Sequence, residues 1–178
     1  MADLGEIVTF SGIIFKPLDP NPDLIDIRDI AHSLSNQCRF TGHSIFHYSV
    51  AQHSIYVSDI TPQEHKMWGL LHDSSEAFLS DIARPIKNQK ELGEIYKRVE
   101  RRLSKAVADK FDLEWPIPES VLHADDVLLR TEQRDLMPNL LRLQGSIYFG
   151  KIIEKWTPEE AEGRFLGRYY ELKEKNGK

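Results

Sequence analysis

The chain has 178 residues, of which 40% are hydrophobic and 29% charged, and its formal net charge is −5. This length and apolar content predict one soluble domain over residues 1–178 with a sizeable hydrophobic core. A negative balance without a block of like charge argues against a nucleic-acid partner. The lone Cys38 excludes an internal disulfide and any zinc site built from several cysteines.

Neither a membrane anchor nor a secretion signal is visible in the sequence. No apolar stretch reaches the roughly 18 residues that a membrane-spanning helix needs. The first residues, Met-Ala-Asp-Leu-Gly-Glu, lack the basic and apolar regions of a signal peptide. We therefore expect a cytoplasmic protein, or one of the host cytoplasm if a phage encodes it, with no membrane partner.

The N-terminal region predicts a hairpin, a connector and a helix. Residues 7–15 are rich in β-branched and aromatic side chains around Gly12, which is typical of a short β-hairpin. Three prolines then form a stiff connector. Asp26 is typical of a helix N-cap, and the apolar residues that follow it recur with helical spacing. Residues 36–48 break this pattern and predict a loop rich in Arg, His and aromatic residues.

Two capping patterns predict the helices in the middle of the chain. Ser49 and Gln52 form a capping box for a helix that carries His53. The run Thr61-Pro62-Gln63-Glu64 places a cap, a proline and an acid in the order typical of a helix start. We expect that helix to continue to His72-Asp73.

The rest of the chain predicts three further helices. Apolar residues between Leu92 and Val107 indicate a long amphipathic helix after Pro85. Another is expected from about Glu119 to Leu136, and Thr157-Pro158 begins a last helix over about residues 158–174. The sequence therefore predicts an all-α bundle, with a core over about residues 23–140 and a short N-terminal hairpin.

Four ionisable residues lie where apolar side chains are expected. His72-Asp73 follows two leucines, while His53 and Asp125 share helix faces with aliphatic residues. Burying such groups unpaired would cost several kcal/mol, so they normally bind a metal or each other. Their mixed nitrogen and oxygen donors suit Zn, Mn, Co or Fe better than Ca. Each residue taken alone is also explained as a hydrogen-bonded polar side chain in the core.

Other histidines and acids compete for the same role. His43 and His47 have the i, i+4 spacing of a helical metal site, but Gly42 and the polar residues around it argue against a helix there. Asp126 competes with Asp125. Its offset of about 100° turns it away from the apolar face of the expected helix.

These segments together resemble the HD-domain phosphohydrolases. The match is His53, then His72-Asp73, then Asp125 in a helical context, and it covers roughly residues 7–140. The segments 48–54 and 71–77 resemble the short bacterial and phage members that act on deoxynucleotides. His53 and His72 are only 19 positions apart, which departs from many members of the family and leaves the preferred substrate length open.

The resemblance implies one divalent metal, Zn, Co or Mn with additional Mg as an option, held by four residues. These are His53, His72, Asp73 and Asp125. It also implies two catalytic acids. Glu76 would orient or deprotonate the attacking water, and Asp81 would lie near the leaving oxygen.

The resemblance further implies a substrate site next to the metal. Arg39 and Lys87 would hold the phosphate oxygens, Phe40 would pack on the sugar, and Pro85 would line the base pocket. Arg84 and Lys90 are alternative phosphate contacts.

The implied activity is attack of water at the α phosphorus of a 2′-deoxynucleotide. We expect foremost a dATP triphosphohydrolase that releases deoxyadenosine and triphosphate. The alternatives are a 5′-deoxynucleotidase acting on deoxynucleoside monophosphates, and a non-catalytic metal-binding bundle that senses nucleotides. Hydrolysis of a cyclic dinucleotide or a guanosine tetraphosphate alarmone would need further signature histidines, which the sequence does not show.

A homo-oligomer is also expected. Members of the HD-domain family that the chain resembles form dimers and hexamers. The sequence also contains apolar residues beyond those needed for the expected core. These lie in the late helix 158–172 and at Tyr148, Phe149 and Trp156.

Overall fold

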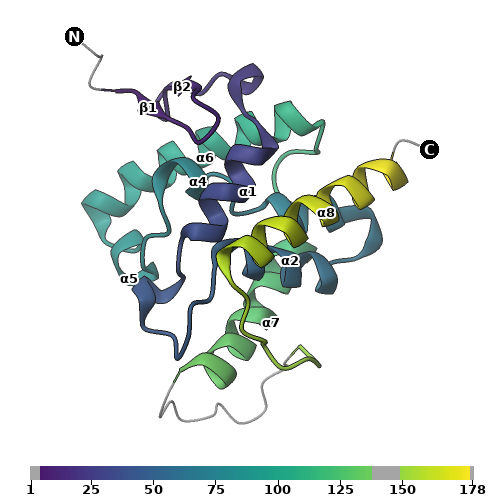
Figure 1. Ribbon diagram of the computed structural model, residues 1–178. Helices are drawn as coiled ribbons and strands as arrows, with labels where there is room; N and C mark the ends of the chain where they lie inside the picture. Colours follow the sequence, from purple (N-terminus) through teal and green to yellow (C-terminus); the bar gives the residue numbers. More distant parts are fainter. Residues whose placement is uncertain (1–4, 138–148, 177–178) are drawn as a thin grey trace.

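The computed structural model describes residues 5–137 and 149–176, and this part of the chain is mostly α-helical with one short hairpin. The strands are β1 (Ile7–Val8) and β2 (Ile14–Phe15). The helices are α1 (Ile27–Asn36), α2 (Val50–Ile60), α3 (Lys66–Leu71), α4 (Glu76–Leu79), α5 (Arg84–Lys87), α6 (Lys90–Phe111), α7 (Glu119–Leu136) and α8 (Pro158–Asn176). The predicted fold class is confirmed (Figure 1).

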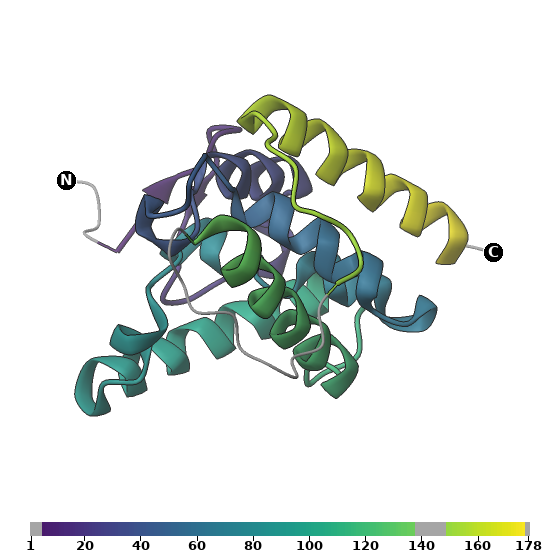
Figure 2. The ribbon, with the colours of Figure 1, turned by 90° about the horizontal axis from the view of Figure 1, so that it is seen from below.

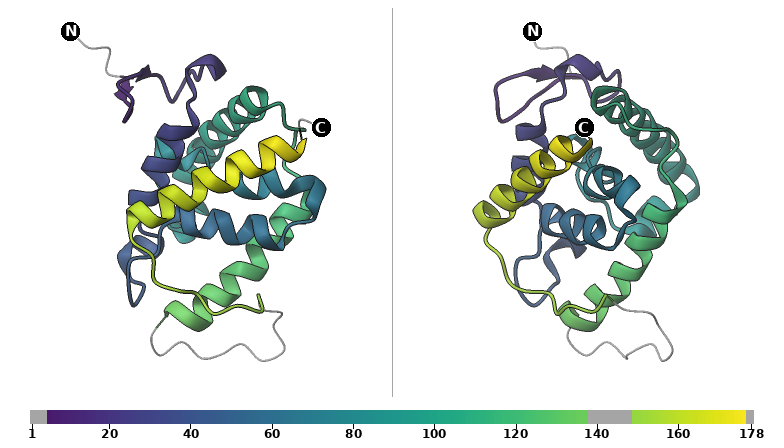
Figure 3. Two further views of the ribbon diagram at one scale, coloured as in Figure 1. Left: turned by 45° about the vertical axis from the view of Figure 1, so that its right-hand side comes forward. Right: turned by 90° about the vertical axis from the view of Figure 1, so that its right-hand side faces the viewer.

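The N-terminal hairpin is antiparallel and is anchored to α1. Ile7 pairs with Phe15 and Val8 with Ile14, and Gly12 supplies a positive φ of 85° in the connecting turn. The backbone N–H and the hydroxyl of Ser11 donate to the two carboxylate oxygens of Asp29 at 2.7 and 2.8 Å. The tip of the hairpin is therefore fixed to α1, while the hairpin itself stands out from the helices (Figure 3).

Helix α2 forms the centre of the bundle. It packs against α1, α3, α7 and α8, and nearly all of its residues are buried. Helix α8 crosses α1, α2 and α3 (Figures 1 and 3). The last helix of the chain is therefore an integral layer of the core.

Several apolar residues on which the oligomer was predicted lie inside the bundle, because α8 packs against the core. The inward face of α8 consists of Ala161, Phe165, Tyr169 and Leu172, all buried within this chain. Trp156 is buried too, and Phe149 packs against the core. Tyr148 lies outside the described residues. These described apolar groups pack inside the bundle, whereas Tyr170 of α8 is 50% exposed, and the homo-oligomer stays a prediction.

Side-chain caps begin three of the helices as predicted. Asp26 accepts the backbone N–H of Arg28 at the start of α1, and Ser49 accepts that of Gln52 at the start of α2. At the start of α8, Thr157 and Glu160 accept each other's backbone N–H in a complete capping box.

The predicted helix start at Thr61 is wrong. The Thr61 hydroxyl donates to the carbonyl of Val57 at 2.8 Å, so it belongs to the end of α2. A 3₁₀ turn over Gln63–His65 follows, and α3 begins only at Lys66. Helix α3 ends at Leu71, so His72 and Asp73 lie in the turn that leads to α4.

Helix α6 departs in part from the predicted apolar face. Tyr96, Leu103 and Val107 are buried, but Leu92 and Ile95 are 55% and 54% exposed. The first turns of α6 and the short α5 extend beyond the core (Figure 2, lower left). The prediction fails here because the start of the helix has only α5 to pack against.

Gly69 allows α3 to lie unusually close to α2. A Cβ at this position would stand 2.9 Å from the Cα of Ser58 and 2.7 Å from the Oγ1 of Thr61. Only a residue without a side chain fits there. This close contact brings α3 against the C-terminal end of α2, the helix that carries His53.

None of the helices in residues 5–137 and 149–176 combines the length and the apolar character needed to cross a membrane.

Candidate metal centre

Three elements converge on a buried cluster of histidine and carboxylate side chains. His53 comes from α2, His72 and Asp73 from the turn after α3, and Asp125 from α7. The Nε2 atoms of the two histidines are 3.3 Å apart, and Oδ2 of Asp73 lies 3.5 and 3.3 Å from them. Oδ1 of Asp125 is 3.2 Å from Nε2 of His53. The group of His53, His72 and Asp73 could hold a metal ion.

The hydrogen bonds around the two histidines show that the cluster fits a cation. Nδ1 of His72 lies 2.8 Å from the carbonyl oxygen of Gly69, and Nδ1 of His53 lies 2.6 Å from a carboxylate oxygen of Glu132. Both partners accept hydrogen bonds, so each Nδ1 carries the proton. In neutral rings both Nε2 atoms then present lone pairs to each other and to Asp73. Electron-rich atoms facing one another in this way are the usual ligands of a divalent transition metal.

The electrostatics of the cluster also favour positive charge. Burial and the nearby Arg39 oppose protonation of His53, yet the carboxylates of Glu132 and Asp125 outweigh them and raise its pKa to about 9. Burial likewise opposes ionisation of Asp73, but His72, His53 and Arg39 hold its pKa well below the usual range. Both shifts have the direction expected of a site that favours positive charge.

Glu132 is a central residue of the site to which the sequence assigned no role. Its side chain is fully buried, with Oε1 on His53 and Oε2 at 3.2 Å from Nη2 of Arg39. It lies seven positions after Asp125 and on the same face of α7. That spacing was the available signal, because a second acid on a face expected to be apolar is as anomalous as Asp125 itself.

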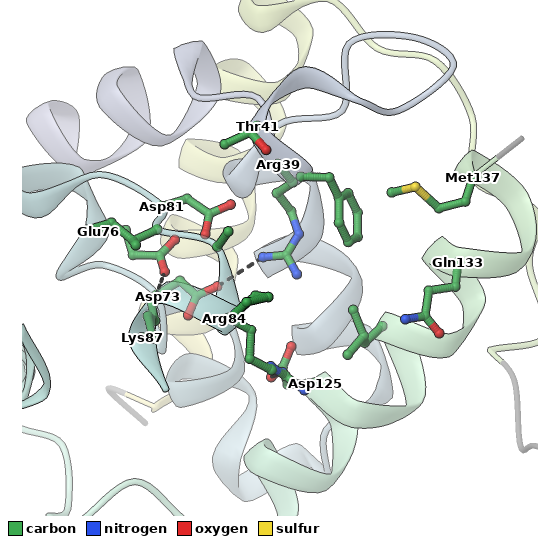
Figure 4. A pocket seen from close by; sticks show the side chains of 15 residues that line it. Arg39, Thr41, Asp73, Glu76, Asp81, Arg84, Lys87, Asp125, Gln133 and Met137 are labelled. Carbon is green, nitrogen blue, oxygen red and sulfur yellow. Dashed lines mark hydrogen bonds and ion pairs between the residues drawn. The ribbon is translucent and has the colours of Figure 1, made fainter. Parts of the chain in front are cut away.

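A cavity of about 480 Å³ opens beside the cluster (Figure 4). It is lined by Arg39, Phe40, Thr41, Asp73, Glu76, Asp81, Ile82, Ala83, Arg84, Pro85, Lys87, Asp125, Leu129, Gln133 and Met137. All the residues assigned to the site from sequence line this cavity, except for His53 and His72. These two are buried behind its wall and contact Asp73, which does line it.

Arg39 lies between the cluster and the cavity. Its guanidinium is 3.5 Å from Asp73 and 3.2 Å from Glu132, and its carbon lies 5.5 Å from the centre of the Phe40 ring. Phe40 and Thr41 have positive φ values of 56° and 53°, an uncommon conformation for residues with side chains. Such backbone strain is often concentrated at binding sites. Here it occurs at two residues that line the cavity.

Glu76 is held by one oxygen and has the other free. Oε1 accepts a hydrogen bond from Nζ of Lys87 at 2.8 Å (Figure 4). Oε2 is buried and has no hydrogen-bond partner among the described residues. Burial and the neighbouring Asp73 raise the pKa of Glu76 to about 8. A carboxylate in this state is a stronger base than an exposed one and has an oxygen available to accept a proton.

Lys87 is more constrained than the sequence suggested. Besides Glu76 it donates to Glu100 on α6 at 2.9 Å, so two of its three N–H groups are engaged with carboxylates. It lines the cavity, as a phosphate contact would, but its charge is already balanced.

Gln37 holds the segment that carries Glu76 and Asp81. Its side-chain amide donates to the carbonyl of Glu76 and accepts the backbone N–H of Asp81, both at 3.0 Å. Between them Ser80 has a positive φ of 73°. Nothing in the sequence points to Gln37, because these contacts join residues about forty positions apart.

The alternative ligands and phosphate contacts lie in different surroundings. The Asp126 side chain is 60% exposed, against 25% for Asp125. His43 ends a 3₁₀ turn and His47 contacts the carbonyl of Ser35, so no helix pairs them. Arg84 lines the cavity with a largely exposed side chain that lies 3.8 Å from Asp125 and 3.9 Å from Asp126. Lys90 is exposed at the start of α6.

Two bacterial proteins are similar to this chain over nearly its whole length, whereas no protein-family model matches it. Uncharacterized protein YfdR of Escherichia coli strain K12 is 39% identical over 175 residues, which cover 94% of this chain and 96% of the relative. Uncharacterized protein RCAP_rcc00048 of Rhodobacter capsulatus is 31% identical over 184 residues, with 91% and 92% covered. Neither description states an activity, so function has to be argued from the site.

Proposed function

We propose that this chain, which belongs to the same protein family as Escherichia coli YfdR, is a metal-dependent phosphohydrolase that acts on 2′-deoxynucleotides. One observation carries the proposal. A buried cluster of histidine and aspartate ligand atoms adjoins a cavity whose wall holds a carboxylate with one free oxygen and a guanidinium group. The resemblance to HD-domain phosphohydrolases supports the same activity.

His53, His72, Asp73 and Asp125 would hold the metal. A divalent ion held there would supply Lewis-acid polarisation of the phosphorus and would favour ionisation of water near neutral pH. The free Oε2 of Glu76 has no hydrogen-bond partner among the described residues, and in this proposal it accepts the proton of the attacking water. Lys87 holds the other oxygen and so fixes the direction of the carboxylate.

Asp81 and Arg39 act on the substrate from two parts of the cavity wall. Asp81 follows the strained Ser80, and its position is fixed by the hydrogen bond from its backbone N–H to Gln37. It would lie near the leaving 5′-oxygen, which takes up the proton that Glu76 removed from the water. Arg39 neutralises charge on the non-bridging phosphate oxygens. Phe40 packs on the sugar, and Pro85 borders the base.

The charge balance of the cavity favours a short phosphate chain. Its wall has four carboxylates, at Asp73, Glu76, Asp81 and Asp125. Its cations, among the described residues, are Arg39, Arg84 and Lys87, each within 4 Å of at least one carboxylate. A triphosphate carries far more negative charge than a monophosphate and needs more unengaged cations. The cavity therefore supports the 5′-deoxynucleotidase alternative better than a dATP triphosphohydrolase.

Product analysis by chromatography tests the proposal. The purified protein, stripped of metal, is incubated with Co, Mn, Zn or Mg and a panel of deoxy- and ribonucleoside mono-, di- and triphosphates. We expect a deoxynucleoside and phosphate from the deoxynucleoside monophosphates, only with metal present and with ribonucleotides spared. The Glu76→Gln variant, prepared in the same way, controls for contaminating phosphatases.

The other outcomes of this experiment distinguish the alternatives. Intact triphosphate released from dATP would show a triphosphohydrolase. No turnover with any metal, combined with nucleotide binding measured by calorimetry, would replace the proposed activity with nucleotide sensing.

A further inference from the structure

Helix α6 reaches the candidate catalytic carboxylate through a lysine. Nζ of Lys87 lies 2.8 Å from Oε1 of Glu76 and 2.9 Å from Oε1 of Glu100, so it bridges the two acids. Glu100 comes from the middle of α6, whereas Glu76 begins α4. The bridge thus connects the site to a helix that contributes no residue to the wall of the cavity.

Two further contacts of α6 hold this bridge in place. Nζ of Lys87 lies 5.1 Å from the centre of the Tyr96 ring, within the range of a cation–π interaction. The Tyr96 hydroxyl donates to the carbonyl of Ser80 at 2.8 Å. Tyr96 and Glu100 are four positions apart and share a face of the helix. One turn of α6 therefore contacts both Lys87 and the strained residue between Glu76 and Asp81.

A lysine alone is a poor anchor for a catalytic carboxylate. Its ammonium group is a point charge on a flexible stem, so a single ion pair leaves both partners several rotamers. A second carboxylate on a long helix restricts the ammonium to the position between the two acids. Burial also matters, because the Lys87 side chain is only 18% exposed and has little freedom to leave.

We infer that Glu100 is a positioning residue, which acts through Lys87 to hold Glu76 with its free oxygen directed to the reacting water. This inference rests on the proposed function, because it assigns the role of Glu100 within that reaction. Glu100 itself does not line the cavity and touches neither substrate nor metal ligands.

Steady-state kinetics of the Glu100→Gln variant test the inference. We expect kcat to fall roughly tenfold to a hundredfold, the usual cost of removing an outer-shell partner. KM and the amount of bound metal should stay unchanged, since the metal ligands and Arg39 are untouched. Glu94→Gln is the matched control, because Glu94 is an exposed glutamate on the same helix. It should behave as the unmodified protein.

A double-mutant cycle shows whether Glu100 acts through the lysine. In a Lys87→Met background, Glu100→Gln should lower kcat no further, because the bridge is already lost. An equal loss of kcat in both backgrounds would overturn the inference, as would an unchanged kcat in Glu100→Gln. A rise in KM with kcat unchanged would assign Glu100 to substrate binding and overturn it as well.

Labelling of Lys87 separates this inference from the proposed function. The rate at which an amine-reactive reagent modifies Lys87, followed by peptide mass spectrometry, does not depend on turnover. It should rise in Glu100→Gln and not in Glu94→Gln, because the ammonium is released from one of its two acids. Faster labelling in a protein that hydrolyses no nucleotide would refute the proposed function and, with it, the positioning role of Glu100 in that reaction. An unchanged labelling rate in an active enzyme would overturn the inference about Glu100 and leave the proposed function unaffected.

Discussion

The two sides of the cavity are built differently. On the metal side, His53 and Asp125 come from helices of 11 and 18 residues that pack in the core, and His53 is fully buried. On the other side, residues 76–87 form two helices of only four residues each, joined by residues 80–83, of which Ser80 has a strained backbone. Arg84 and Pro85 are exposed there. The metal side is therefore rigid, and the opposite wall is adaptable only at the exposed Arg84 and Pro85, because Lys87 and Gln37 hold Glu76 and Asp81.

The largest effect is expected from the rigid side. His72→Ala should remove bound metal and reduce turnover to background, because it deletes a ligand atom whose position is fixed by the hydrogen bond to Gly69. Metal content by elemental analysis and product release measure the two losses together. An active protein without metal would refute the metal centre.

Two neighbouring acids test the orientation of α7. Asp125→Ala should lose metal and most of the turnover, because Oδ1 of Asp125 lies 3.2 Å from Nε2 of His53. Asp126→Ala should be close to the unmodified protein in both measurements, since its side chain is 60% exposed. The reverse result would place Asp126, and not Asp125, in the site.

Glu76 lies at the boundary between the two sides, and its substitution should separate metal binding from catalysis. Glu76→Gln keeps the shape of the side chain but cannot accept a proton, so turnover should fall by about 10² to 10⁴-fold with metal retained. Single-turnover kinetics together with metal analysis provide the test. Loss of metal in this variant would show that Glu76 is a metal ligand and belongs to the metal side.

Substitution of Glu132 tests whether a buried residue outside the ligand set helps to fix the position of His53. Glu132→Gln should lower metal affinity roughly tenfold to a hundredfold, because the amide orients His53 less firmly and no longer neutralises Arg39. Metal titration by calorimetry measures the change. Glu119→Gln, at the exposed start of α7, is the control. Equal affinities in the two variants would show that His53 needs no such partner.

The smallest effect is expected on the adaptable side. Arg84→Ala should change the free energy of unfolding by less than about 0.5 kcal/mol, because exposed ion pairs near 4 Å contribute little. Bound metal should stay the same. Denaturant unfolding and metal analysis check both. A loss of metal would mean that the exposed wall supports the ligand set, contrary to the comparison.

The sequence predicted the local structure best where short-range chemistry decides it. Asp26, Ser49 and Thr157 cap helices as expected, since each bonds to a backbone group two or three residues away. Thr61 failed for the same kind of reason. Its hydroxyl could accept a backbone N–H of the following helix or donate to a carbonyl of the preceding one. It donates to the carbonyl of Val57 at the end of α2.

Contacts between distant segments were less accessible from the sequence. Asp125 was found because an acid interrupted an apolar face, but the links of Glu132 to Arg39 and His53 join segments about 80 to 90 residues apart. Lys87 was assigned to phosphate through the resemblance to the HD-domain phosphohydrolases. Its bridge between Glu76 and Glu100 depends on how α5 meets α6, which no local pattern encodes.

Gly69 has a consequence for the choice of ion. The missing side chain lets α3 approach the backbone of Ser58, and the Gly69 carbonyl receives the Nδ1 proton of His72. One residue thus sets both the separation of the two helices and the direction of the imidazole. The gap between the two nitrogen donors therefore depends on helix packing as well as on the contacts of the rings, and we expect an alanine at position 69 to widen it. Any ion held between His53 and His72 would therefore meet a constraint that is set outside these two residues, at the glycine of α3.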